Sequence, residues 1–311
     1  MPPRIILRMT ATADEASSQP ETWEEALDRV GEARAVLVAP GERVLAIGCG
    51  TSAFVAQSYA WLREAAGVGE TDASYASEMP TGRRYDRVVA ITRSGATTEI
   101  LEALSGLPAG TRRVAVTAAS SGAVDAVSDD QVVLGFADEA SVVQTRFPTT
   151  VLALARAALG QDAQQLIKDG RLAVSMPLPA DPSQFQHFVF LGTAWTVGLA
   201  HEAALKVREM AQAWSESYPA MDFRHGPVAA AGSRSLVWLF GQAPNGVVQT
   251  AADAGATVYQ DDTLDPLAQL VLVHRLALQL ATNRGLDPDR PRLLTRSVVL
   301  APTGMSDAPP H

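Results

Sequence analysis

The 311-residue sequence contains one cysteine, Cys49, and no long hydrophobic run. A single cysteine excludes an intrachain disulfide and a cysteine-based metal site, which favours a reducing compartment. The first twenty residues hold only the short apolar run 5–7, too short for the core of a signal peptide. No stretch approaches the roughly 18 apolar residues of a membrane span. We therefore expect a cytoplasmic protein without a membrane partner.

An excess of positive charge is also lacking. Lys and Arg number 25 against 34 Asp and Glu, and the formal net charge is −9. Non-specific binding to nucleic acid requires clustered Lys and Arg, so nucleic acid is not an expected partner. The negative net charge does not exclude a small anionic ligand, because a local site can be positive in an acidic protein. No pair of histidines has metal-ligand spacing and no Ser/His/Asp set lies in an elbow motif, so we expect no metal site.

Apolar residues are plentiful, at 47% against 19% charged, and the length suits two domains. Strands alternate with helices in two series, which predicts an α/β fold with parallel sheets covered on both faces. The first series has an irregular start over 1–20, a helix over 21–38 and strands at 43–47, 86–92, 113–117 and 131–134. Its other helices follow the turn 48–52, running to about 66, and cover 98–107.

The second series has strands at 188–191, 236–240 and 257–259 and helices over 197–214 and 265–284. Its first strand–glycine–helix unit lies about 145 residues after the equivalent unit of the first series, which indicates a duplicated domain. The prolines of 176–182 predict a stiff linker. We therefore predict the following parts: an N-terminal segment and helix 1–38, a first domain 39–170, a second domain 183–303 and a loose tail 304–311.

The segment from Thr92 to Thr97 is a candidate phosphate site. It follows a predicted strand and opens a helix, where open α/β sheets bind ligands. The helix N-terminus offers free N–H groups, Thr92, Ser94 and Thr97 add hydroxyls, and Gly95 permits close approach of the backbone. An ordinary Ser/Thr-rich turn with a helix cap is the alternative interpretation.

The earlier turn Gly48–Ala53 fits the loose dinucleotide pattern G-x-G-x-x-A. Asp72 has about the spacing expected for a ribose contact, but the Thr71–Tyr75 segment is a poor strand end. A tight strand–helix turn explains the glycines equally well, so a nicotinamide-dependent enzyme is a minor alternative.

The helix around 200–211 combines an apolar stripe with Glu202, Lys206 and Glu209 on the opposite face. The ordinary interpretation is a solvated face with a Glu202–Lys206 pair. The functional interpretation is a base, Glu209, beside a cation, Lys206. Downstream, His225 lies in a His-Gly-Pro turn after a polar loop, and loops on a rigid scaffold often carry catalysis.

Six segments in this order resemble the tandem sugar isomerase (SIS) family, above all the isomerase half of glucosamine-6-phosphate synthase and stand-alone phosphosugar deaminases and isomerases. The segments are Gly48–Ser52, Thr92–Thr97, Glu139–Thr145, Glu202–Glu209, His225–Pro227 and Asp289–Val298. The resemblance implies two SIS domains, each a parallel sheet flanked by helices in three flavodoxin-like layers.

The resemblance also implies roles for individual residues. Glu209 would move a proton between C1 and C2 of a sugar phosphate, Lys206 would tune it, and His225 would assist ring opening in the partner subunit of a homodimer. No cofactor is implied. The sugar phosphate and its hydroxyls would be held by Gly50, Thr51, Ser52, Thr92, Arg93, Ser94, Gly95, Thr97, Val142 and Gln144.

Departures from the family pattern bear on the substrate. Residues 1–38 are too short for the synthase's glutaminase domain, so we do not expect glutamine-dependent synthesis. Arg296 stands where the synthase has a catalytic lysine, and arginine stays protonated, which excludes an imine there. Gln144 replaces a serine and Arg93 a glutamine. We expect an isomerase or deaminase of an amino- or keto-hexose 6-phosphate; the alternatives are a non-catalytic sugar-phosphate sensor and a deglycase of sugar-amine phosphates.

Overall fold

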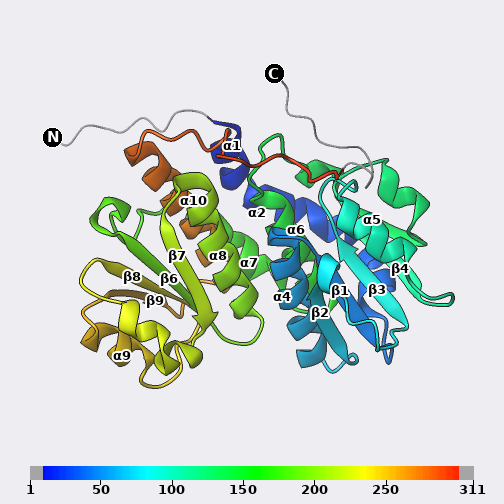
Figure 1. Cartoon of the computed structure of the whole chain (residues 1–311), viewed down its shortest axis with the longest axis horizontal. Helices are drawn as coiled ribbons and strands as arrows, with labels where there is room; N and C mark the ends of the chain where they lie inside the picture. The colour runs from blue at the N-terminus through cyan, green and yellow to red at the C-terminus, as the bar shows by residue number, and fades with distance from the viewer. Residues whose placement is uncertain (1–9, 301–311) are drawn as a thin grey trace.

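The computed structural model describes residues 10–300, which form two parallel β-sheets with helices packed against both (Figure 1). The first sheet has the order β2-β1-β3-β4-β5 and the second the order β7-β6-β8-β9. All pairings are parallel. The strands are β1 Val44–Gly48, β2 Thr71–Tyr75, β3 Arg87–Ile91, β4 Arg112–Thr117, β5 Asp130–Val133, β6 His187–Gly192, β7 Trp214–Pro219, β8 Ser235–Phe240 and β9 Thr257–Asp261.

The α-helices join these strands and cover the sheets. Parallel neighbours need such crossovers, because a short hairpin can link only antiparallel strands. The helices are α1 Ala11–Ser17, α2 Gln19–Ala26, α3 Val30–Ala33, α4 Thr51–Ala65, α5 Thr98–Ser105, α6 Arg146–Ala158, α7 Ala163–Ser175, α8 Thr196–Ala211, α9 Val247–Asp253 and α10 Pro266–Asn283. The α/β class with parallel sheets in three layers is confirmed.

The central strands are apolar throughout because both faces are buried. In β1, Leu45 and Ile47 belong to an outer core beneath α5, while Val44 and Ala46 face the middle of the molecule. The second sheet repeats this alternation. Its inner residues, such as Trp238, share one continuous core with the inner face of the first sheet. Helices of both halves, including α4, α7, α8 and α10, fill the space between the two sheets (Figure 1).

The two halves meet closely where α8 crosses α4. A Cβ added to Gly198 would lie 2.2 Å from the Ser58 Oγ and 2.4 Å from the Phe54 carbonyl oxygen. The Ser58 hydroxyl also donates to the Trp195 carbonyl oxygen at 2.8 Å. The absence of a side chain at Gly198 therefore lets the first helices of the two halves pack backbone against side chain.

The N-terminal region differs from the prediction. Residues 11–20, expected to be irregular, are helical, and the single helix expected over 21–38 is divided. Pro20 lies in the first turn of α2 and has no N–H, so it favours a restart of the helix after Ser18. A 3-10 turn at Leu27–Arg29 and a π-helical turn at Arg34–Val38 interrupt the rest.

Two segments that we expected to be irregular are strands. Thr71–Tyr75 forms β2, and residues 214–219, assigned to a helix end and a polar loop, form β7. Each is an edge strand beside the first strand of its sheet. Edge strands are partly exposed and lack the continuous apolar run on which the prediction relied.

Helices α6, α7 and α9 were not predicted. Helix α7 continues to Ser175, beyond the expected end of the first domain at residue 170, and the proline-rich segment begins directly after it. The other predicted strands and helices agree with the structure to within a few residues. The predicted loose tail, 304–311, lies outside the described residues.

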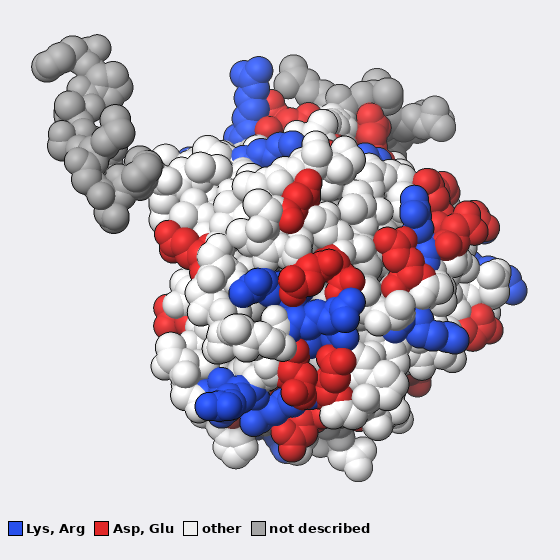
Figure 2. Space-filling model, turned by 90° about the vertical axis from the view of Figure 1, so that its right-hand side faces the viewer, with Lys and Arg blue, Asp and Glu red and all other residues white. Residues whose placement is uncertain are grey.

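Within residues 10–300, no helix combines the length and apolar character needed to cross a bilayer. Acidic and basic side chains are interspersed on the face drawn in Figure 2, with no continuous basic patch there. Over the same residues, no group of three His, Cys, Asp or Glu side chains is placed to hold a metal ion.

Candidate functional site

The turn from Thr92 to Thr97 connects the carboxyl end of β3 to α5. Gly95 has φ +63°, and a Cβ there would lie 3.0 Å from Val124 Cγ1, so both conformation and space require glycine. The Ser94 hydroxyl accepts from the Ala96 N–H at 3.3 Å. The turn is thus preformed at a helix N-terminus, where backbone N–H groups and the helix dipole favour an anion.

A small pocket opens beside this turn. Two buried oxygens that line it, Thr92 Oγ1 and Gln144 Oε1, have no hydrogen-bond partner among the described residues. Buried polar atoms are nearly always paired in proteins, so these two indicate room for polar groups of a ligand. The pocket is lined by Cys49, Ser52, Ile91, Thr92, Arg93, Ser94, Thr97, Ile100, Gln144 and Arg296.

Four predicted binding residues lie just outside this lining. Gly50, at φ +52°, precedes the first residue of α4 and shapes that turn. The Thr51 side chain turns toward α8. Gly95 lies within the 92–97 turn itself, and Val142 is partly buried in the loop that carries Gln144.

Arg93 acts as part of the pocket wall. Its guanidinium is buried and donates to the carbonyl oxygens of Ser141 at 2.9 Å and Arg296 at 2.8 Å. Burial lowers the pKa of Arg93, while nearby Glu139 opposes that shift. The side chain therefore joins three separate segments around the pocket instead of pointing freely into it.

Arg296 fixes the C-terminal segment across the same site. Its guanidinium makes two bonds to the Asp138 carboxylate, at 2.6 and 2.7 Å, and one to the Glu139 carbonyl oxygen at 3.0 Å. Farther along, Thr98 N–H donates to the Val298 carbonyl oxygen at 3.3 Å. The segment thus runs from α10 to the start of α5 (Figure 1) and covers one side of the turn.

The loop from Glu139 to Thr145 is held from inside the protein. Glu139 accepts from the Thr145 N–H and hydroxyl, and burial raises the pKa of its carboxyl group. Glu15 of α1 accepts from the Ala140 N–H at 2.5 Å and from the Ser141 hydroxyl. The N-terminal helix therefore positions the loop that carries Gln144.

A second cluster lies on α8. The Lys206 ammonium is fully buried and donates to Glu209 Oε2 at 2.5 Å and to Thr51 Oγ1 at 3.0 Å. Glu202 Oε1 lies 3.4 Å from the same nitrogen. Burial alone would lower the pKa of Lys206, but Glu202 and Glu209 outweigh it and raise that pKa.

The solvated-face interpretation of this helix is wrong. Glu202 is 2% exposed and Lys206 0%, because this side of α8 packs against α4 of the other half. Only Glu209, with 17% of its side chain exposed, borders solvent. Burying a charge without a partner is costly, so the three side chains must be buried together as mutually paired groups.

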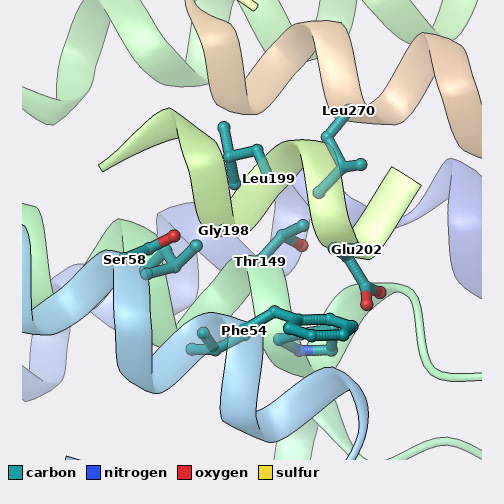
Figure 3. A pocket seen from close by; sticks show the side chains of 10 residues that line it. Phe54, Ser58, Thr149, Gly198, Leu199, Glu202 and Leu270 are labelled. Carbon is teal, nitrogen blue, oxygen red and sulfur yellow. The ribbon is translucent and has the colours of Figure 1, made fainter. Parts of the chain in front are cut away.

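Glu202 was not predicted as a site residue. Its position four residues before Lys206 indicated only an ordinary ion pair. Its carboxylate borders a narrow, mainly apolar gap between the halves that is too small for a water molecule, near Phe54, Leu199 and Leu270 (Figure 3). Burial raises the pKa of Glu202 to about 7, against the opposing effect of Lys206. Neither of its oxygens has a hydrogen-bond partner among the described residues.

The start of α4 connects the two clusters. Thr51 accepts from Lys206, and the next residue, Ser52, lines the pocket beside the 92–97 turn. Two consecutive residues thus join the 92–97 turn of one half to the charged cluster of the other.

His225 lies apart from both clusters within the chain. It ends the exposed 3-10 turn Asp222–His225, which packs near β7 and α9. Among the described residues its side chain makes no hydrogen bond and does not line the pocket. Its predicted role in a partner subunit stays a prediction.

The dinucleotide pattern has a structural explanation. A Cβ on Gly48 would lie 2.3 Å from the Ser52 backbone, so this glycine permits the tight strand–helix turn. Asp72 already accepts from the Tyr85 hydroxyl at 2.7 Å and from Arg83 at 2.9 Å. These contacts favour the tight-turn interpretation over a ribose site.

No protein-family model matches the sequence. Among curated proteins, the chain is 26% identical to a glutamine–fructose-6-phosphate aminotransferase (isomerizing) from Gloeobacter violaceus, over 92% of the chain and 58% of that protein. A homologue from Aeropyrum pernix with the same name is 28% identical over 90% of the chain and 55% of its own length. The chain thus spans about half the length of the curated relatives it matches.

Solved structures share the fold across nearly the whole chain. Glucosamine-6-phosphate deaminase from Thermotoga maritima superposes with a TM-score of 0.78 at 24% identity, covering 94% of this chain and all of that one. Tagatose-6-phosphate ketose/aldose isomerase from Escherichia coli gives 0.75 at 19% identity, covering 96% and 98%. The chain therefore has the three-layer α/β/α fold, with parallel sheets, of these two phosphosugar enzymes.

Proposed function

We propose that this protein is a cofactor-independent isomerase or deaminase of an amino- or keto-hexose 6-phosphate. The observation that carries the proposal is the Thr51–Ser52 link, which puts the anion-binding turn and the Lys206–Glu209 pair at the same helix start. The similarity to phosphosugar enzymes supports the substrate class.

In this proposal the first half, 39–170, holds the phosphate. The N-terminus of α5 and the hydroxyls of Ser94 and Thr97 take the dianion. Thr92, Ser52 and Gln144 bond to sugar hydroxyls, because their polar atoms line the pocket. Arg93 keeps the wall in place through its two carbonyl bonds.

The second half, 183–303, provides the proton transfer. Glu209 takes the proton from one of the carbons C1 and C2 and returns it to the other, through an enediol or enolamine. Lys206 stabilises the negative charge that develops on the substrate oxygen. Arg296 forms no imine with the keto sugar, since its guanidinium stays protonated and is paired with Asp138.

His225 assists ring opening from the second subunit of a homodimer in this proposal. Its exposure and its distance in the fold from the pocket residues of its own chain are compatible with a role between subunits. Sedimentation tests this part: a monomer with full activity would contradict it. A cytoplasmic location is part of this proposal and agrees with the single cysteine, Cys49.

The experiment is a thermal-shift panel of hexose and hexosamine 6-phosphates, followed for each hit by solvent-deuterium exchange at C1 and C2 and an ammonia assay. We expect exchange in the wild type, and none above background in Glu209→Gln, which still binds the sugar phosphate. Binding without exchange in the wild type would instead identify a sensor. No stabilisation by any phosphorylated sugar would reject the proposal.

A further inference from the structure

Buried Lys206 has two carboxylates, and the proposed chemistry uses only one of them. Glu209, at 2.5 Å, borders solvent and is the proposed base. Glu202, at 3.4 Å, is 2% exposed, lies beside the narrow gap between the halves (Figure 3) and does not line the pocket at the 92–97 turn. Burying a carboxylate is costly even beside a cation, so the presence of Glu202 requires a reason.

The reason lies in what Glu209 must do. Each turnover makes Glu209 a neutral acid for part of the reaction, and at that moment a buried ammonium would lose its counter-charge. A lone Lys206–Glu209 pair would also hold Glu209 as carboxylate and make it a poor base. A second carboxylate beside the ammonium removes both difficulties.

No other described group takes this place. Thr51 from α4 contributes only a hydroxyl. Glu139 acts on Lys206 from a distance, but its carboxylate is engaged by Thr145 and Arg146. His274 of α10 is neutral, because burial lowers its pKa to about 3. Among residues 10–300, only Glu202 and Glu209 lie within ion-pair distance of Lys206.

We infer that Glu202 is a positioning residue: it is the standing counter-charge of Lys206 and leaves Glu209 free to take and return the substrate proton. This inference rests on the proposed function. Glu202 exchanges no proton with the substrate. In its ionised form, which prevails above its raised pKa of about 7, it keeps the ammonium neutralised and in place while the proton resides on Glu209.

The test compares wild type with Glu202→Gln, which keeps the shape and removes the charge. We expect kcat to fall about 10- to 100-fold with KM for the sugar phosphate changed less than about threefold. The acid limb of the kcat/KM profile should move to lower pH, since Lys206 then pairs with Glu209 alone. Glu202→Asp should restore part of kcat, and Glu216→Gln, a carboxylate that pairs with His187 instead, should change neither.

A titration that needs no turnover separates this inference from the proposed function. In protein with ¹³C-labelled Glu carboxyls, the Glu209 signal, assigned with Glu209→Gln, should titrate at lower pH in Glu202→Gln than in wild type. The same midpoint in both proteins would overturn the inference even if the enzyme is active. A shifted midpoint in a protein inactive on every phosphosugar would support the charge coupling and reject the proposed function. Glu202→Met, which also removes the charge and keeps a similar length, serves for both measurements if the glutamine variant does not fold.

Discussion

The two halves of the molecule use the same scaffold for different tasks. Both sheets run in the order second, first, third, fourth strand. In both, the first central strand ends in a glycine that touches the backbone of the helix residue four positions later. A Cβ added to Gly48 would lie 2.3 Å from Ser52, and one added to Gly192 would lie 2.2 Å from Thr196. The turn geometry is therefore common to both halves, and their chemistry must come from other side chains.

The side chains at equivalent places diverge. The turn after β3 carries Thr92, Ser94 and Thr97, while the turn after β8, 241–246, reads Gly-Gln-Ala-Pro-Asn-Gly and offers no hydroxyl. Conversely, the Glu202, Lys206 and Glu209 positions of α8 correspond to Ser58, Leu62 and Ala65 of α4 when the two glycines are aligned. One half thus carries the hydroxyl-rich turn and the other the Glu–Lys–Glu helix, and close packing of α4 on α8 joins them.

The largest expected effect comes from the helix comparison. Lys206→Met should lower kcat by about a thousandfold, because it removes the cation beside Glu209 and leaves two carboxylates facing each other. The matched change in the other half, Leu62→Met, replaces one apolar side chain by another and should leave kcat within about twofold. Steady-state kinetics on the hit from the phosphosugar panel measures both. Equal losses would show that the two helices do not differ in function.

The turn comparison predicts a loss of binding. The double variant Ser94→Ala, Thr97→Ala should bind hexose phosphates about 10- to 100-fold more weakly, since two hydroxyl donors to the dianion are lost. The affinity for unphosphorylated sugars should change less than about threefold. Calorimetry measures both ligands, with Gln242→Ala in the β8 turn as the control. An equal loss for both sugars would contradict a phosphate role for this turn.

The junction of the halves predicts a change in stability. Gly198→Ala forces a Cβ to within 2.4 Å of α4 atoms and should destabilise the protein by about 1–3 kcal/mol. Gly31→Ala, in α3 with nothing within 4 Å of the added Cβ, should be neutral or slightly stabilising. Denaturant unfolding gives both values. If Gly198→Ala were neutral, α4 and α8 would not be in this close contact.

The smallest effect concerns pH. Burial raises the pKa of Glu202 in the folded protein to about 7, above its value in the unfolded chain. The folded protein therefore binds this proton more tightly, which stabilises it at low pH, and the stabilisation is lost as pH rises through about 7. The melting temperature of Glu202→Gln minus that of wild type should therefore increase by roughly 2–5 °C between pH 5 and 8. Glu139 and His274 titrate in both proteins and cancel in the difference. A constant difference across this range would show that Glu202 does not titrate there.

Much of the scaffold could be predicted from the sequence. The central strands are short apolar runs bounded by glycine or polar residues, and the turn after β3 was placed at a helix start. The prediction did not identify β2 and β7, whose polar, half-exposed residues follow no apolar pattern. It also gave a single helix over 21–38 after an irregular start, where the structure has several short helices, because short helical pieces depend on packing more than on propensity.

By itself, the sequence determined the alternation of strands and helices, the hydroxyl-rich turn and the Glu–Lys–Glu spacing, because these follow from local patterns within a few residues. Tertiary structure alone decided that Glu202 and Lys206 are buried, since this depends on α4 packing against that face of α8 across about 150 residues of chain. It also decided that Arg93 and Arg296 build the pocket wall, through contacts between segments that no local pattern relates.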